Sequence, residues 1–289
     1  MASIDRQDLV AERMFGQTDH RNGAAALRWA TRTLVSTFWV SAVIFGLYII
    51  SFYVGALSDG SPERWNESLP RLYDPDTLVA TIAIAAHFAT GAVLLLFGPI
   101  QLIASVRESM PQLHRWLGRI YGSTALITGV GGLVFIALNG TIGGAPMNVG
   151  FGLYGALTVV AAFQAIRHAR ARRFDQHRAW AIRLFALAIG SWLYRMDYGF
   201  WRIVANGLGH TRSFDGPFDI VMVFFFYIPN LLVAEVFIRT RKMHVRPAMR
   251  PIAVLLVSAT TIFVAVGTYY FTAYQWGPRI LARIIGRSV

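Results

Sequence analysis

Seven long apolar stretches constrain this chain more than any other feature of its sequence. A helix needs about 20 apolar residues to cross the hydrocarbon core of a bilayer. The stretches lie at Leu34–Val54, Leu78–Val106, Trp116–Leu138, Val149–Ile166, Trp180–Tyr198, Phe218–Ile238 and Ile252–Ala273. Because unpaired backbone groups are strongly disfavoured in lipid, each stretch is expected to be helical. The sequence therefore predicts an all-α, polytopic transmembrane helical bundle of about seven helices.

The composition agrees with a membrane protein. Only 15% of the 289 residues are charged and the mean hydropathy is +0.48, whereas a soluble domain is about 25% charged. There are no cysteines, so disulfides, thiolate metal sites and cysteine nucleophiles are excluded. The formal net charge of +12 does not indicate nucleic acid binding, because the basic residues flank apolar stretches. The expected partners are the lipid bilayer and its anionic lipids.

The distribution of charge predicts the topology. Most lysines and arginines fall in the first 33 residues and in every second loop, which the positive-inside rule assigns to the cytoplasm. The first outer loop, SDGSPERWNESLPRLYDPDT, is mostly acidic. We therefore expect an N-terminus inside and a C-terminus outside. The predicted parts are a cytoplasmic segment at 1–33, a transmembrane domain at 34–275 and a basic tail at 276–289.

Two segments at predicted inner helix ends are similar to each other. Residues 101–115 read QLIASVRESMPQLHR and residues 164–178 read QAIRHARARRFDQHR. The identical pairs are Gln101/Gln164, Ile103/Ile166, Arg107/Arg170, His114/His177 and Arg115/Arg178. Each copy joins the inner end of one helix to the start of the next, so we interpret them as a parallel two-helix repeat.

Ionisable groups inside apolar stretches mark function or a buried partner. They form two sets by depth in the membrane. The inner set comprises His114, Arg115, Arg119, His177, Arg178, Arg183, Asn230 and Glu235. The outer set comprises His87, Arg195 and Asp197.

Three hypotheses follow from these sets, beside a purely structural interpretation. His114 and His177 lie at equal predicted depth, so they are candidate axial ligands of haem b, with arginines holding its propionates. Alternatively, the inner arginines bind an anionic lipid or a quinone-like ligand. The outer set suggests transport or proton transfer, because the pKa of histidine lies near neutrality. In the structural interpretation, the arginines neutralise nearby carboxylates such as Glu235 and otherwise set the topology.

Soluble-enzyme signatures are missing from the sequence: there is no Walker loop, GxGxxG, HExxH or GxSxG. The remaining histidines are expected to be solvated in loops or at helix edges. They are His20, His168, His210 and His244.

Several motifs resemble a known family. They are His87, FGPIQL at 97–102, LHRWLGRIY at 113–121, HRAWAIR at 177–183 and PNLLVAE at 229–235. Together, over residues 80–240, they resemble the bacterial membrane family DUF2306. The resemblance implies a multi-pass protein of the bacterial cytoplasmic (inner) membrane, with no established activity. The HR-x-x-G pattern is also similar to b561-type cytochromes, but those carry paired histidines at both faces, and His87 has no outer partner.

The leading prediction is an integral membrane protein whose inner site binds haem b or an anionic lipid- or quinone-like ligand. An alternative is a non-catalytic accessory or assembly subunit that contacts other membrane subunits. The third is a small-molecule or proton transporter. Whether the protein is an enzyme is left open by the sequence.

Overall fold

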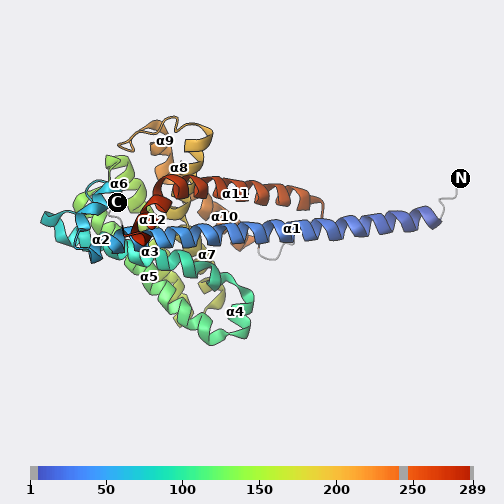
Figure 1. Ribbon diagram of the computed structural model, residues 1–289. Helices are drawn as coiled ribbons and strands as arrows, with labels where there is room; N and C mark the ends of the chain where they lie inside the picture. Colours follow the sequence, from blue (N-terminus) through green and yellow to red (C-terminus); the bar gives the residue numbers. More distant parts are fainter. Residues whose placement is uncertain (1–5, 241–246, 287–289) are drawn as a thin grey trace. The chain divides into compact units, whose positions relative to one another are not determined.

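The computed structural model describes residues 6–240 and 247–286, and the regular elements of this part of the chain are helical (Figure 1). This agrees with the predicted all-α class. The helices are α1 (Arg6–Tyr48), α2 (Gly55–Ser58), α3 (Leu78–Leu102), α4 (Ala104–Ser109), α5 (Pro111–Asn139), α6 (Gly144–Arg170), α7 (Phe174–Ala188), α8 (Gly190–Val204), α9 (Pro217–Phe225), α10 (Ile228–Arg239), α11 (Arg250–Phe271) and α12 (Gly277–Ile284). Residues outside the described ranges include His244 and the outermost parts of the predicted terminal segments.

The described residues divide into two units, 6–41 with 247–265 and 42–240 with 266–286. In the first unit, the Arg250 side chain lies 3.7 Å from where a Cβ on Gly23 would stand. Arg28, Arg32 and Arg250 contribute to the lining of a groove of about 430 Å³ there. The second unit contains every residue of the predicted inner and outer sets, so the site is described within it.

Four helices form the core of the second unit. Helix α3 packs on α5, α5 on α6, α6 on α7, and α7 on α3, while α10 packs on α7 and α9 on α6. Glycines allow these close contacts. A Cβ on Gly131 of α5 would lie 2.6 Å from Ala83 O of α3, and one on Gly150 of α6 would lie 2.6 Å from Val223 O of α9. Such small-residue contacts are typical of packing between membrane helices.

Six helical segments of the described residues are long and apolar enough to cross a membrane. They are Gly23–Ser58, Pro75–Leu102, Pro111–Asn139, Gly144–Arg170, Pro217–Arg239 and Arg250–Ile284. Each overlaps a predicted crossing, so the protein spans the membrane several times. The stretch predicted at Trp180–Tyr198 is not among them, because it is divided between α7 and α8, which are 15 residues each.

Two helix boundaries differ from those of the predicted stretches. Helix α1 already begins at Arg6, so it runs through most of the segment predicted to precede the first crossing. Helix α3 ends at Leu102 rather than near Val106, because Ile103 adopts an extended conformation (φ −72°, ψ 116°).

Candidate functional site

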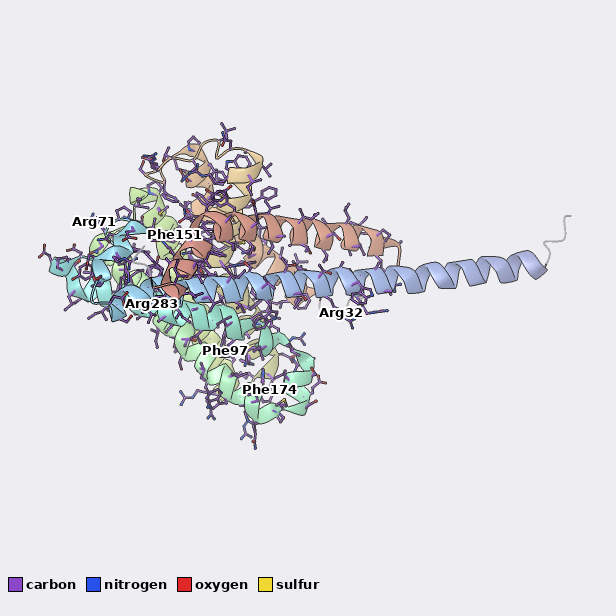
Figure 2. All side chains as sticks on the ribbon, viewed as in Figure 1. Arg32, Arg71, Phe97, Phe151, Phe174 and Arg283 are labelled. Carbon is purple, nitrogen blue, oxygen red and sulfur yellow. The ribbon has the colours of Figure 1, made fainter. Side chains whose placement is uncertain are left out.

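The two histidines of the inner set occupy the same place on their helices. Helix α5 begins at Pro111 and α7 at Phe174, so His114 and His177 are each the fourth residue. Phe97 and Phe174 mark this end of the core in Figure 2, and Phe151 lies toward the other end. Because α5 and α7 both pack on α3 and α6, the two histidines lie at the same end of the core.

Several contacts align the helix ends that carry this pair. A Cβ on Gly118 of α5 would lie 3.4 Å from Gln101 Oε1 at the end of α3, and one on Gly122 would lie 2.9 Å from the Ile166 side chain of α6. His177 Nδ1 of α7 lies 2.9 Å from Ala165 O of α6. The ends of α3 and α6 and the starts of α5 and α7 are therefore at one level.

The contact to Ala165 decides the chemistry of His177. A carbonyl oxygen only accepts, so Nδ1 carries the proton and donates it to Ala165 O. In the neutral imidazole, Nε2 is then the unprotonated nitrogen. This is the arrangement in which a histidine ligates a metal, with its second nitrogen bonded to the protein.

His114 differs from His177 although their positions correspond. Its Nδ1 is buried and has no hydrogen-bond partner in the described residues. The residue equivalent to Ala165 is Leu102, after which the chain leaves the helix at Ile103. The break in the first hairpin thus accompanies the loss of the bond that fixes His177 in the second.

Other buried polar atoms without a partner lie on α3, α5 and α6. We call this group the inner polar cluster. Within the described ranges it consists of Gln101 Nε2, His114 Nδ1, Tyr121 OH, Gln164 Oε1 and His168 Nδ1. Tyr121 OH lies 3.2 Å from where a Cβ on Gly98 of α3 would stand. His168 was expected to be solvated. Its Nδ1 atom is buried, although the residue as a whole is partly exposed.

Glu235 is engaged by two arginines. Arg183 donates to Glu235 Oε2 from Nη2 (2.6 Å) and Nε (3.1 Å), and Arg239 Nε donates to Oε1 (2.9 Å). The Arg183 guanidinium also lies 4.8 Å from the centre of the Trp180 ring. Glu235 therefore fastens α10 to α7, and it does not face a histidine.

The remaining inner residues divide between structural and exposed positions. Asn230 Nδ2 donates to Phe226 O (2.7 Å), which satisfies a carbonyl left free where α9 breaks into α10. Arg115 and Arg119 are exposed on α5, and Arg178 is partly buried on α7. The exposed pair suits an anionic group that approaches from outside the bundle.

In the outer set, His87 joins α3 to α5. Its Nδ1 donates to Thr128 O (2.8 Å), and Thr90 and Thr128 share a hydroxyl hydrogen bond of 2.7 Å one turn away. A Cβ on Gly132 would lie 3.0 Å from His87 Nδ1. His87 is therefore packed and bonded within the bundle.

Arg195 and Asp197, the other members of the outer set, are not paired. Arg195 Nη1 donates to Ser191 O (2.7 Å), and its guanidinium lies 4.8 Å from the centre of the Phe45 ring. Asp197 makes no hydrogen bond or ion pair within residues 6–240 and 247–286. Among the described residues, no carboxylate is hydrogen-bonded to both Arg195 and His87, so the two do not form a proton relay.

Sequence reasoning missed a buried carboxylate network at the other end of the core. Asp219 is fully buried and accepts from Tyr198 OH (2.6 Å), His210 Nδ1 (2.7 Å), and the backbone N–H groups of Thr211 and Gly216 (3.0 Å each). The prediction of a solvated His210 was wrong, because its side chain is only 8% exposed. The sequence signal was the Gly-Pro pair that precedes Asp219 at the start of α9, where a carboxylate is favoured.

No group of three or more histidine, cysteine or acidic residues that would hold a metal ion occurs within the described chain. Residues 84–238 match the family described as Predicted membrane protein (DUF2306). Neither the curated proteins nor the solved structures contain a match to this chain.

Proposed function

The chain belongs to the DUF2306 family of predicted membrane proteins, and from this premise we propose a seven-crossing topology with α7 and α8 as one crossing. The N-terminus is inside and the C-terminus outside, in the bacterial cytoplasmic membrane. Contacts along α6 support the seventh crossing. His177 lies beside Ala165, Tyr154 OH donates to Leu187 O (2.8 Å), and the Tyr194 and Phe151 rings are 5.3 Å apart.

These contacts place α7 and the start of α8 antiparallel to α6 between residues 165 and 151, and α6 itself is long enough to cross. Helices α9 and α10 then return in the opposite direction, from the Tyr198–Asp219 bond to the Arg183–Glu235 ion pair. Helices α7 and α8 have 15 residues each, which together make about 45 Å of helix and exceed the about 30 Å of the hydrocarbon core. Neither helix is long enough to cross by itself.

We further propose that the inner polar cluster binds the head group of a quinone-like, lipid-soluble ligand. The observation that carries the proposal is the set of buried polar atoms without partners at one end of α3, α5 and α6. Buried polar atoms are normally paired, since leaving one unpaired costs about 1–3 kcal/mol. Several at one level indicate that a partner from outside the chain completes them.

The types of atom in the cluster suit a ring with two carbonyls. Gln101 Nε2 and Tyr121 OH donate to carbonyl oxygens, and Gln164 Oε1 accepts from the hydroxyls of the reduced ring. When bound, such a ligand supplies two-electron, two-proton redox chemistry. His114, whose ring nitrogen is unbonded, is the group able to exchange a proton, while His177 is held by Ala165. Exposed Arg115 and Arg119 favour an anionic lipid surface nearby.

Haem b is the second candidate, and the tautomer of His177 favours it. His177 Nε2 and the unbonded ring of His114 would hold the iron, which supplies one-electron redox chemistry when bound. Arg115 and Arg178 are the arginines suited to its propionates. Arg183 is less suited to that role, because Glu235 already occupies its guanidinium.

A titration of the purified full chain tests the quinone proposal. Tryptophan fluorescence is followed as a short-tailed benzoquinone is added to the protein in mild detergent. Gln101→Ala is expected to weaken binding about 10-fold, because a buried hydrogen bond is lost. Gln112→Ala, an exposed glutamine on α5, is the matched control and is expected to bind like the wild type.

The outcomes of the same preparation separate the candidates. Equal quinone binding by the two variants would refute the cluster as the site. A Soret band that is lost in both His114→Ala and His177→Ala would assign the site to haem. A colourless protein that binds no quinone would favour the alternative of an accessory subunit, in which the ion pairs of Glu235 and the bond of His87 only hold the bundle together.

A further inference from the structure

Arg195 carries a positive charge among the core helices without a compensating acid. Of its five N–H groups, one is seen in a hydrogen bond within the described residues, from Nη1 to Ser191 O (2.7 Å). No ion pair in the part of the chain that the structure describes includes Arg195. A guanidinium does not lose its proton in proteins, so this charge is either left uncompensated or neutralised by something from outside the chain.

The nearest acids of the chain do not neutralise it. Asp197 is two residues further along α8, and positions i and i+2 of a helix point about 200° apart. Asp219 is already surrounded by donors, since its two oxygens accept from Tyr198, His210 and two backbone N–H groups. Neither carboxylate is available to Arg195.

The surroundings of Arg195 are aromatic. Tyr194, whose ring lies 5.3 Å from that of Phe151 of α6, directly precedes Arg195. Its guanidinium lies 4.8 Å from the centre of the Phe45 ring. The phenols already donate elsewhere: Tyr53 to Ser68 (3.0 Å), Tyr154 to Leu187 O (2.8 Å) and Tyr194 to Tyr198 (2.9 Å). Arg195 is thus an unneutralised cation among aromatic side chains, which suit contact with an apolar molecule.

We propose that Arg195 binds the carboxylate of a lipid-soluble organic acid, a monoanion with an apolar body, among α1, α3, α6 and α8. The planar guanidinium offers two parallel N–H groups to a carboxylate, which is the geometry that such a pair prefers. The apolar body lies against the aromatic rings. This site is independent of the inner polar cluster and does not require the quinone proposal.

The experiment compares an acid with its neutral counterpart. The fluorescent fatty acid cis-parinaric acid and its methyl ester are titrated into the full chain in phosphatidylcholine nanodiscs. The wild type is expected to bind the acid at least about 10-fold more tightly than the ester, the effect of one charge-assisted hydrogen bond. Arg195→Gln is expected to abolish this preference. Arg202→Gln, an exposed arginine on the same helix, is expected to retain it.

Equal binding of acid and ester by the wild type would overturn the proposal, and so would a preference that survives in Arg195→Gln. If Arg195→Gln does not fold, Arg195→Lys decides, since it keeps the charge and loses the fork. A preference reduced several-fold in Arg195→Lys supports the proposal, and an unchanged one contradicts it. Competition by phosphatidylglycerol added to the nanodiscs would assign the site to a lipid phosphate and overturn the carboxylate assignment.

Discussion

Replacing Gly131 of α5 by alanine tests whether α3 and α5 are in backbone contact. The added Cβ would lie 2.6 Å from Ala83 O and 3.4 Å from His87 N. A comfortable contact needs about 3.5 Å, so the two helices would have to separate by nearly 1 Å at this point. The separation also strains the bonds that Thr128 makes with His87 (2.8 Å) and Thr90 (2.7 Å).

The expected magnitude combines three contributions. Overpacking costs about 1–3 kcal/mol, and weakening the two hydrogen bonds costs about 0.5–1.5 kcal/mol each. Alanine gains about 1 kcal/mol over glycine in a helix interior. We therefore expect Gly131→Ala to lower the free energy of unfolding by about 1–5 kcal/mol.

The assay is unfolding of the purified protein by sodium dodecyl sulfate, followed by circular dichroism. The matched control is Gly152→Ala on α6, because a Cβ there meets nothing within 4 Å. The control is expected to be as stable as the wild type or more stable by about 0.5–1 kcal/mol. If Gly131→Ala unfolds like Gly152→Ala, the close approach of α3 and α5 is refuted.

Two further predictions concern single carboxylates. Asp219→Asn is expected to destabilise the protein by about 2–6 kcal/mol, because the amide leaves two of the four buried donors without an acceptor at about 1–3 kcal/mol each. The exposed Asp215→Asn should cost less than about 1 kcal/mol in the same assay. Similar losses in the two variants would contradict the network. At Asp59, the hydrogen bond from Arg283 (2.6 Å) lowers the carboxyl pKa from its ordinary 3.8. The stability that the Asp59 carboxylate contributes is fully present above pH 3.8 and is lost as the pH falls through its lower folded-state pKa. An acid titration monitored by circular dichroism should show this loss in the wild type and not in Asp59→Asn.

The sequence predicted the features that depend on local composition. Apolar stretches of sufficient length identified the all-α class and six of the crossings, because the bilayer restricts a spanning chain to few structures. The repeated motif placed His114 and His177 at the same position on two helices, and the structure shows each as the fourth residue of its helix at the same end of the core. Both results depend on the chain's own periodicity and charge pattern, which sequence reasoning can read.

The bonding of individual side chains was not predictable, because it depends on contacts between distant segments. Nothing local indicates that His177 donates to Ala165 while His114 has no partner; that difference follows from the break at Ile103. His210 looked solvated because its burial depends on Asp219 from another element. Likewise, the sequence predicted one continuous stretch at Trp180–Tyr198 and did not indicate its division between α7 and α8.

The most direct test of the inner polar cluster is to measure whether quinone co-purifies with the protein. The full chain is purified from bacterial membranes in mild detergent, extracted with organic solvent, and its quinone content per protein is quantified by chromatography with mass detection. The proposal predicts quinone at a level approaching one per protein in the wild type and in Gln112→Ala, and much less in Gln101→Ala. Equal amounts in all three preparations, or none in the wild type, would contradict the assignment of these buried polar atoms to a quinone-like ligand.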